Sequence, residues 1–411
     1  MILGYQYLIV SSSSKIMNRN VVMVAPFGYY KKGTVRARMI PIAEELEKRN
    51  YQVTIVIPPW DNPSEGGTRH EKNGVELIHL DTNGDSVFNH LKLIIETIRK
   101  VRELDPDIVH TFKPIGEAGM TALFFSQLTD YPVVLDSDDW EGNGGQRLRS
   151  DRSKLTNSLL NLQEQYIPRT VDAVTVASRT LETQMWGNKI PPKRTFYAPN
   201  GQTENRIQMD RANGDIVRRK YEIGENLMVL LYTRFFEYDL NRVARIVAET
   251  IKHNARTEFV VVGKGRYEEH DKFAAEIQSL GLTGSVHMVG WVEFDELPNY
   301  FAAADVAIYP FDDTLINRSK CPAKLTELLV AGVPVVADNV GQISEYIHHD
   351  ESGVLVEPGN EERFVKEILR FIDESQRRDK IAEAARNRML TKFSWSSITD
   401  KVEGAYEVAG R

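Results

Sequence analysis

The sequence predicts an α/β protein built from two doubly wound parallel sheets. Apolar, β-rich segments alternate with amphipathic helical segments in two series, and a polar stretch between Asn200-Gly201 and about Glu225 separates the series. Such alternation implies right-handed crossovers and parallel strand pairing. A chain of 411 residues is too long for one ordinary core, so we expect two domains. Ligands of open α/β sheets bind beyond the carboxyl ends of the strands, so the two sheets should face one cleft.

Each series supplies expected strands in a regular order along the chain. An amphipathic helix carrying Met39, Ile42, Ala43 and Leu46 follows the first strand, and another helix is expected over residues 91–104. The first-series strands are expected at residues 21–25, 51–57, 75–79, 108–111, 133–136 and 173–177. The second-series strands are expected at residues 227–232, 258–262, 286–290, 305–309, 333–337 and 353–356.

A short helix between two of these strands carries charges where an anion would bind. Pro322 suits a helix start, because its missing N–H would be unpaired there anyway. Lys320 and Lys324 lie near this start, where free backbone N–H groups and the macrodipole already favour an anion. Glu327 follows one turn later on the same face. The segment therefore predicts a pocket for a ligand with phosphates at one end and hydroxyls at the other.

Composition and charge bound the class of protein. The net charge is −7, with +1 in residues 1–200 and −8 in the rest, which argues against a general nucleic-acid binder. The single cysteine, Cys321, excludes an intramolecular disulfide and indicates a reducing, cytoplasmic compartment. No apolar run approaches the roughly 18–20 residues that span a bilayer. Residues 1–16 lack a secretory pattern and are expected to be an N-terminal extension.

Six short motifs follow one another in an order typical of one protein family. The motifs are Pro106-Asp107-Ile108-Val109-His110, Pro199-Asn200-Gly201, Val261-Val262-Gly263-Lys264-Gly265, Val289-Gly290-Trp291-Val292, the block 327–336, and Gly341-Gln342-Ile343-Ser344-Glu345-Tyr346-Ile347 with Gly353-Val354-Leu355-Val356. Each motif is weak alone, but together they resemble the GT-B glycosyltransferases, particularly family 4 (group 1). The resemblance covers about residue 20 to about residue 395.

The resemblance implies a GT-B fold, in which two Rossmann-like domains face a cleft. Residues 17–203 would form the acceptor-side domain and residues 204–392 the nucleotide-sugar-binding domain. The closing helix, within residues 393–411, would pack back on the first domain and couple the two halves.

The resemblance also implies an activity. The enzyme would move a sugar from a nucleotide diphosphate sugar to a hydroxyl acceptor (a glycan, a lipid-linked acceptor or a small molecule) in polysaccharide or glycoconjugate biosynthesis. Retention of configuration follows by analogy with the family, and no cofactor is expected. The Asp136-x-Asp138 pattern also spells the metal motif of the GT-A fold, but the other motifs favour GT-B, whose members generally need no bound metal.

Several residues of the second half match donor-binding positions of the family. Arg234 matches the diphosphate-binding arginine, and its fixed charge and forked donors suit that role. Glu327 matches the glutamate that contacts the donor ribose. Gly263, Gly265 and Val292 belong to donor-side motifs, although the glycines could simply turn the chain after a buried strand.

The chain departs from the family at two charged positions. Members usually place a lysine five or six residues after the diphosphate-binding arginine, where this chain has Asp239 and Leu240. The first of two glutamates eight positions apart falls on Ser319. Our hypothesis is that Lys320 and Lys324 supply the missing phosphate-binding charge; the alternative is that both are ordinary surface lysines.

The loop from Gly28 to Gly33 follows the first strand and precedes a helix. It resembles the family's glycine-rich loop, which approaches the donor diphosphate and the acceptor, and it is neither a Walker loop nor a dinucleotide-binding fingerprint. Thr34 and Arg38 follow it and could reach the acceptor side of the cleft. The alternative is an ordinary surface loop.

Acidic residues follow the strand at 133–136. Many family members have a histidine at the position of Asp138, near the transferred sugar. A carboxylate there could accept a sugar hydroxyl or orient the acceptor, and a raised pKa would let it act as a base. Asp139 and His110 are expected on the acceptor side, and the alternative is that the acidic residues only cap a turn.

Two groups of basic residues bear on where the acceptor could be located. Helix 91–104 carries Lys92, Arg99, Lys100 and Arg102 beside isoleucines and leucine, and residues 147–154 add a basic cluster. Such a surface could meet the inner face of an anionic membrane that bears a lipid-linked acceptor, although an amphipathic helix packed on its sheet is the commoner explanation.

Two other functional classes remain open. A nucleotide-sugar epimerase or hydrolase of the same fold would convert the donor without an acceptor. A non-catalytic nucleotide-sugar-binding protein is also compatible with the lost charges.

Overall fold

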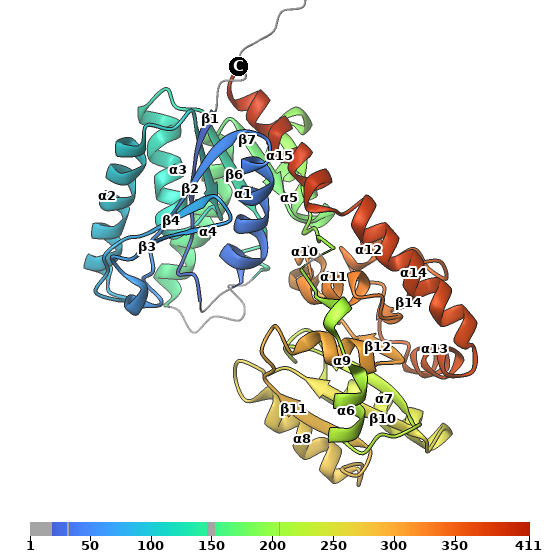
Figure 1. The fold of residues 1–411 in the computed structure, drawn as a ribbon. Coiled ribbons are helices and arrows are strands. Elements are labelled where there is room, and N and C mark those ends of the chain that lie inside the picture. Colours follow the sequence, from blue (N-terminus) through green and yellow to red (C-terminus); the bar gives the residue numbers. More distant parts are fainter. Residues whose placement is uncertain (1–18, 31–32, 146–152, 205) are drawn as a thin grey trace, which may run out of the picture.

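The computed structural model describes residues 19–30, 33–145, 153–204 and 206–411, and it contains two α/β sheets (Figure 1). The expected extension at residues 1–16 lies outside the described residues. The strand order is β3-β4-β2-β1-β5-β6-β7-β8 in the first sheet and β11-β10-β9-β12-β13-β14 in the second. The first sheet and its helices form the upper lobe in Figure 1 and the second sheet lies in the lower lobe. Two doubly wound sheets are thus confirmed.

The first lobe is built from the elements between residues 19 and 197. Its strands are β1 (Arg19–Val24), β2 (Tyr51–Ile57), β3 (Arg69–Lys72), β4 (Val75–His79), β5 (Ile108–Phe112), β6 (Val133–Ser137), β7 (Ala173–Val176) and β8 (Thr195–Tyr197). Its helices are α1 (Ile40–Glu47), preceded by the π-helical turn Val35–Met39, and α2 (Val87–Leu104), α3 (Gly116–Leu128), α4 (Lys154–Thr170) and α5 (Arg179–Gly187).

The second lobe follows, and the last helix leaves it again. Its strands are β9 (Leu227–Tyr232), β10 (Thr257–Val262), β11 (Val286–Gly290), β12 (Val306–Tyr309), β13 (Val335–Asp338) and β14 (Val354–Val356). Its helices are α6 (Gly214–Lys220), α7 (Leu240–His253), α8 (Glu269–Ser279), α9 (Leu297–Ala303), α10 (Leu315–Ser319), α11 (Ala323–Val330), α12 (Ile343–Tyr346), α13 (Glu361–Asp373) and α14 (Ser375–Thr391); the final helix is α15 (Trp395–Ala409).

Every strand expected from the sequence is present, and the structure adds β3 and β8. Strand β3 pairs antiparallel with β4, so the first sheet is not wholly parallel. All four residues of β3 are exposed, and a strand without a buried face lacks the apolar pattern that marks a strand in the sequence. Strand β8 is only three residues long and lies at the other edge of the sheet.

The first sheet is buried on both faces. Val21 and Met23 belong to the core cluster on the face that α1 and α15 cover, whereas Val22 and Val24 belong to the cluster under α2, α3 and α4. Because both faces are covered, the strands appear in the sequence as continuous apolar runs. Their carboxyl ends remain free to carry polar side chains toward the second lobe.

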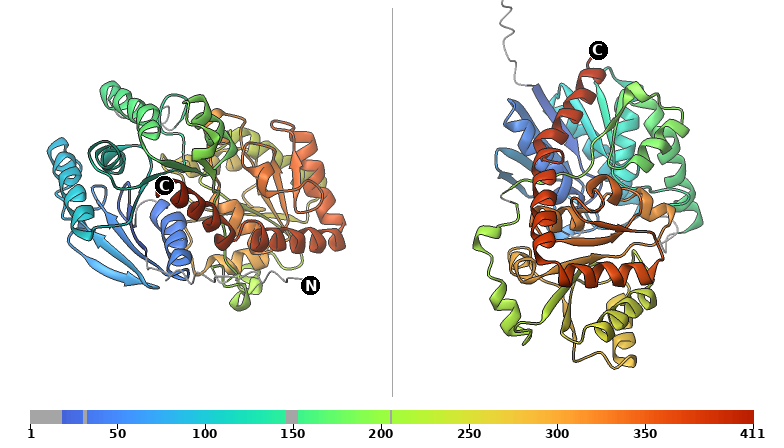
Figure 2. Two further views of the ribbon diagram at one scale, coloured as in Figure 1. Left: turned by 90° about the horizontal axis from the view of Figure 1, so that it is seen from above. Right: turned by 90° about the vertical axis from the view of Figure 1, so that its right-hand side faces the viewer.

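The chain crosses between the lobes twice, and the two crossings lie side by side. The backbone of Gln202 in the first crossing is hydrogen-bonded to Phe393 and Trp395 in the second, at 2.9 and 3.1 Å. Helix α15 then packs against α1 and β7 (Figure 2). His110 Nδ1 on β5 lies 2.8 Å from the Tyr406 hydroxyl oxygen on α15. A buried polar contact thus joins the end of the chain to the middle of the first sheet.

The burial of His110 should make stability depend on pH. Burial lowers the pKa of His110 from 6.5 to about 4. Between pH 6.5 and 4, His110 is therefore protonated in the unfolded chain but neutral in the folded protein. The free energy of unfolding should decrease as the pH falls through this range. The loss should reach about 3 kcal/mol. Urea unfolding of the wild type and of His110→Gln should show the difference between their unfolding free energies shrinking over this range.

A matched control is His348→Gln, which replaces an exposed histidine of the second lobe. Its unfolding curve should follow the wild type at every pH. Parallel pH profiles for the wild type and His110→Gln would contradict the proposed role of His110.

Candidate functional site

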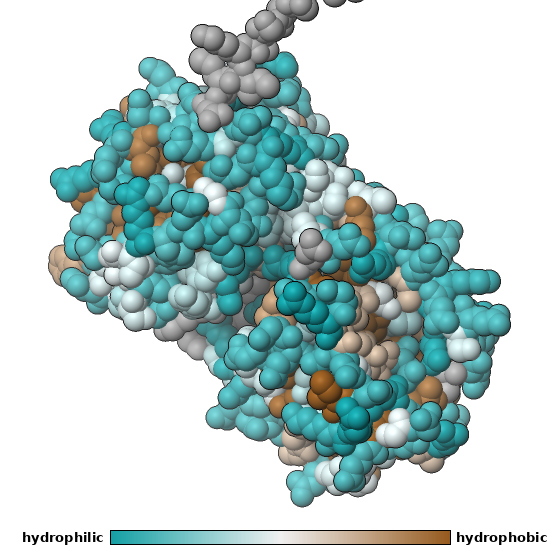
Figure 3. Space-filling view, viewed as in Figure 1, coloured by the Kyte–Doolittle hydropathy of each residue, from teal (hydrophilic) through white to brown (hydrophobic). Residues whose placement is uncertain are grey.

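A crevice lies between the two lobes in the space-filling view (Figure 3). Asp139, which follows β6 of the first lobe, is near enough to Lys320 and Arg234 of the second lobe to be affected by their charges. Hydrogen bonds also link the two lobes. The Ser178 hydroxyl donates to the Ser319 carbonyl at 2.7 Å, and the Asn200 side-chain amide donates to the Cys321 carbonyl at 2.8 Å. These hydrogen bonds bring the segment around residues 319–321 of the second lobe next to the first lobe, at the edge of the crevice.

A buried lysine organises the side of the crevice formed by the first lobe. Lys113, just beyond β5, is 3% exposed, and its ammonium lies 2.8 Å from Asp138, 2.8 Å from Asp139 and 2.6 Å from Glu141. The Thr34 hydroxyl donates to the other oxygen of Asp138 at 3.1 Å. Three carboxylates and one cation give this cluster a formal negative balance when all are ionised.

The cluster shifts the protonation of its two aspartates in opposite directions. Burial raises the pKa of Asp138 to about 6, against the opposing attraction of Lys113. Burial also acts on Asp139, but its ion pair with Lys113, helped by Lys320 and Arg234 across the crevice, leaves its pKa below the ordinary value. Asp138 is thus the carboxylate suited to hold or accept a proton near neutral pH.

Asp136 and Asp138, whose spacing also spells a metal motif, have different partners within the protein. Asp136 is fully buried and accepts from Arg38 at 2.8 and 2.6 Å and from the Thr175 hydroxyl at 2.6 Å. Asp138 instead pairs with Lys113. Each carboxylate already has its own cationic partner within the protein.

Two expected acceptor-side residues do not reach the crevice surface. Arg38 is 2% exposed, and its guanidinium also donates to the Ala198 carbonyl and the Asn200 side chain. His110 is fully buried beside Tyr406. Both side chains are buried within the first lobe, so neither can touch a ligand in the crevice. Arg38 instead positions Asp136, and His110 contacts Tyr406.

The loop after β1 also differs from the expectation. The Gly28 N–H donates to Asp61 at 2.7 Å, and the next two backbone N–H groups donate to Glu65 at 2.7 and 2.9 Å. Gly28 therefore does not offer its N–H to a phosphate. Gly33 has an open environment and leads directly to Thr34, which does reach the cluster. Residues 31 and 32 lie outside the described residues.

On the second lobe, Glu327 and Lys324 converge from α11 on one tyrosine. The Tyr232 hydroxyl, at the end of β9, donates to Glu327 at 3.0 Å. The Lys324 ammonium stands 3.2 Å from the centre of the Tyr232 ring. Burial lowers the pKa of Lys324 to about 8, although nearby Glu327 favours its charge. Among the described residues, the contact that the Lys324 ammonium makes is with the Tyr232 ring rather than with a carboxylate within ion-pair distance.

Lys320 is less free than the hypothesis assumed. Its ammonium forms an ion pair of 3.0 Å with Glu237, in the segment that follows β9. Arg234 lies exposed in the same segment, with its guanidinium 4.5 Å from the Phe236 ring centre. Arg234 and Lys324 are therefore the stronger candidates for binding a diphosphate, and Lys320 has part of its charge neutralised.

The two departures from the family pattern have local structural roles. Asp239 caps α7, where its side chain accepts from the Arg242 N–H at 3.0 Å. Ser319 is 1% exposed, and its hydroxyl donates to the Ile316 carbonyl at 2.7 Å. Neither residue replaces the missing charge.

Gly263 is required by a close approach of two strand ends. Its φ is +133°, and a Cβ there would lie 1.9 Å from the Thr233 carbonyl oxygen, next to Arg234. Gly265 turns the chain toward Glu269 at the start of α8. Val292 is buried after β11. Gly263 therefore permits the close backbone approach beside Arg234, and the contact of either glycine with a donor remains a prediction.

Sequence reasoning missed Lys113, Tyr232 and Glu237. Lys113 and Tyr232 stand at or just beyond the carboxyl end of an expected strand, which is the signal that could have drawn attention to them. Their partners are far away in the sequence, so spacing alone did not reveal the ion pairs.

Comparison with known proteins agrees with this arrangement. The family described as "Glycosyl transferases group 1" matches residues 215–388, and the "Glycosyl transferase 4-like domain" matches residues 33–201. A lipopolysaccharide 1,2-N-acetylglucosaminetransferase from Salmonella typhimurium is 26% identical over 268 residues, covering 62% of this chain and 68% of the relative.

Solved structures agree in fold. A sucrose-phosphate synthase from Thermosynechococcus elongatus aligns with a TM-score of 0.74 at 16% identity, covering 95% of this chain and 98% of that one. Anabaena Alr3699/HepE in complex with UDP-glucose aligns with a TM-score of 0.71 at 17% identity, covering 95% and 100%. The chain belongs to the group 1 glycosyltransferases, and its two lobes have the GT-B fold.

Proposed function

We propose that this glycosyltransferase moves a sugar from a nucleotide diphosphate sugar to a hydroxyl acceptor, with retention of configuration. The observation that carries the proposal is that the Glu327 carboxylate and the Lys324 ammonium both contact Tyr232, on the side of the crevice across from the Asp138 cluster. A ribose hydroxyl suits Glu327 and a diphosphate suits Lys324 and Arg234. The UDP-glucose complex of the structural neighbour supports this class of donor.

Each side of the crevice has a separate task in the transfer. The bond between the sugar carbon and the diphosphate oxygen breaks, the acceptor oxygen bonds to the sugar carbon, and the acceptor proton passes to the departing diphosphate oxygen. Arg234 and Lys324 stabilise the charge that grows on the departing diphosphate. Asp138 accepts a hydrogen bond from a hydroxyl of the sugar or of the acceptor and so orients it. Thr34 and Lys113 hold the Asp138 carboxylate in place.

A panel of UDP-, GDP- and ADP-linked hexoses tests the function. Nucleoside diphosphate release should increase when hydroxyl acceptors are added, and mass spectrometry should detect a new glycoside. Glu327→Ala should lose binding of the donor, measured as loss of its thermal shift. Epimerised donor, or hydrolysis that no acceptor accelerates, would instead establish one of the alternative classes, and a thermal shift without turnover would indicate a binding protein.

The two lysines should contribute unequally to donor binding. Removing a buried, charge-assisted hydrogen bond costs about 1.5–3 kcal/mol, so Lys324→Ala should raise the donor KM about tenfold to a hundredfold. Lys320→Ala should raise it much less, because Glu237 already neutralises part of that charge. Initial-rate kinetics of both variants check this order, and equal effects would contradict it.

The lowered pKa of Lys324 predicts a pH dependence. The diphosphate needs the protonated amine, so kcat/KM for the donor should fall as the pH rises above about 8. In Lys324→Arg the charge persists, and the fall should move to higher pH. Identical profiles for the two proteins would exclude titration of Lys324 as the cause.

We further propose that the outer faces of α2 and α4 contact an anionic membrane. Leu93 of α2 is buried, so it cannot contact a membrane. The exposed apolar side chains of α2 lie in its first half, and those of α4 recur at helical spacing along its exposed face. These side chains, between 49% and 86% exposed, are Val87, Phe88, Leu91, Ile95, Leu155, Leu159, Leu162 and Tyr166. Lys92 and Arg99 are exposed beside them, and most of the basic cluster at 147–154 lies outside the described residues.

The proposal concerns peripheral contact. Within the described ranges, no helix is long and apolar enough to span a bilayer. Apolar side chains with neighbouring lysine and arginine are the combination that binds the surface of an anionic bilayer. Helices α2, α3 and α4 pack in sequence over the same face of the first sheet, which favours one contact surface for the two apolar faces.

Flotation with vesicles that contain anionic lipid tests the membrane proposal. Wild-type protein should float, and the double variant Phe88→Asp, Leu159→Asp should remain at the bottom of the gradient. Ile216→Asp, which alters an exposed apolar residue of the second lobe, is the control and should float. Wild-type protein that stays at the bottom would refute membrane contact.

A further inference from the structure

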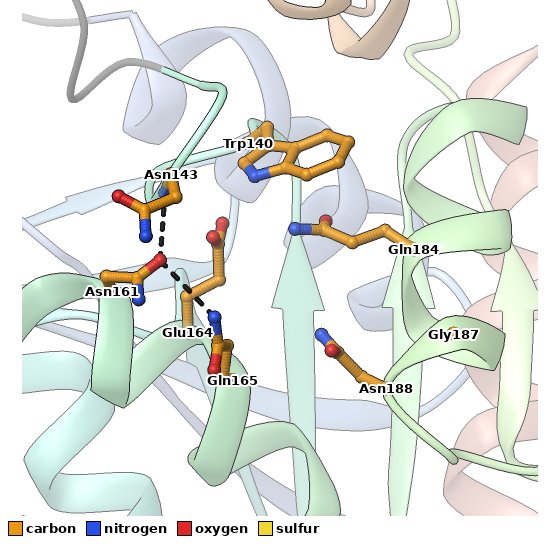
Figure 4. A pocket seen from close by; sticks show the side chains of 8 residues that line it. All are labelled: Trp140, Asn143, Asn161, Glu164, Gln165, Gln184, Gly187 and Asn188. Atoms are coloured by element: carbon orange, nitrogen blue, oxygen red, sulfur yellow. Dashed lines mark hydrogen bonds between the residues drawn. The ribbon is translucent and has the colours of Figure 1, made fainter.

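A second recess lies in the first lobe, between α4 and α5 and below the segment that follows β6 (Figure 4). Its volume is about 250 Å³, somewhat below the ~300–1,000 Å³ of usual small-molecule sites. None of the residues expected to bind donor or acceptor lines it. The lining residues are Trp140, Asn143, Asn161, Glu164, Gln165, Gln184, Gly187 and Asn188.

The walls of this recess are fixed by hydrogen bonds. Glu164, 1% exposed, accepts from the Glu141 N–H at 2.6 Å and the Gly142 N–H at 2.8 Å. Asn161 accepts from the Asn143 N–H at 2.8 Å. These contacts hold the segment after β6 against α4, so the recess between α4 and α5 has a fixed wall before any ligand binds.

The chemistry of the lining favours an uncharged, hydroxyl-rich ligand. Amide side chains dominate it, and no lysine or arginine of the described residues lines it, so a phosphate would find no counter-charge. The only carboxylate, Glu164, is already hydrogen-bonded to two backbone N–H groups and to Gln184. Asn188 and Gln165 add polar groups that a purely apolar ligand would leave unpaired.

Two further features point to a sugar ring. The Trp140 indole lies across the recess with its ring nitrogen toward the interior (Figure 4), which offers an apolar face and an N–H donor together. Gln184 Oε1 is buried beside it without a hydrogen-bond partner among the described residues. A ligand hydroxyl entering beneath Trp140 would supply the missing donor.

We propose that this recess binds a neutral saccharide unit of the acceptor, at a distance from the hydroxyl that reacts. The assignment to an acceptor rests on the proposed function. Trp140 follows Asp138 by two residues, and Glu141 joins the Lys113 cluster. The recess and the reacting side of the crevice thus share one short segment, so a sugar held here orients the rest of the acceptor toward Asp138.

Saturation-transfer NMR without any nucleotide sugar tests the binding site. The probes are methyl α-D-glucopyranoside, N-acetyl-D-glucosamine and maltotriose. At least one should receive saturation from the wild type, and Asn188→Ala and Trp140→Phe should weaken its binding at least fivefold. Gln127→Ala, an exposed amide on α3 outside the recess, should bind as the wild type does. Thermal unfolding of each variant checks that its fold is retained.

The outcomes separate this inference from the proposed function. Absence of saturation transfer from every probe would overturn the saccharide site, and so would equal binding by all the variants, whatever the transferase assay gives. Binding that depends on Asn188 and Trp140 would support the site even if donor turnover proved independent of acceptors, in which case the proposed transfer would fail alone.

Discussion

The buried ammonium of Lys113 is the interaction on which the reacting side of the crevice depends. It meets Asp138, Asp139 and Glu141 within 2.8 Å. Three carboxylates so close would repel one another and could not all remain ionised without a central cation. Burying these charges is costly, and they are tolerated because each is paired. The same contacts fix the segment after β6, and through Glu141 they extend to Glu164 and the recess beneath Trp140.

A second constraint joins this floor to the crossings between the lobes. Arg38 binds Asp136 on one side and the Ala198 carbonyl and Asn200 side chain on the other. Asn200 in turn donates to Cys321 in the second lobe. The strand end that leads to Asp138 and the point where the chain leaves the first lobe are therefore tied through one guanidinium. Helix α15, packed on α1, adds a second connection between the end of the chain and the first lobe.

Sequence reasoning found the fold because buried parallel strands are continuous apolar runs, and it missed β3 because that strand exposes only polar and charged residues. It singled out Glu327 through a local motif, and the contact of Glu327 with a donor stays a prediction. It did not find Lys113, whose three partners stand 25 to 28 positions away. Gly28 was expected to approach a phosphate, but its N–H donates a hydrogen bond to Asp61, which lies 33 positions later. Strand patterns are local properties of a sequence, whereas the pairing of charges depends on which strand ends the fold brings together.

Opposite charges attract one another across the crevice. Asp139 on the first lobe is attracted by Lys320 and Arg234 on the second, while Glu237 neutralises part of the charge on Lys320. A diphosphate bound at Arg234 and Lys324 would compete with Asp139 for Arg234, because both are anions seeking the same guanidinium. Donor binding would then weaken one attraction between the lobes while supplying contacts to the second. After the nucleoside diphosphate left, the attraction between Asp139 and Arg234 would again be unopposed.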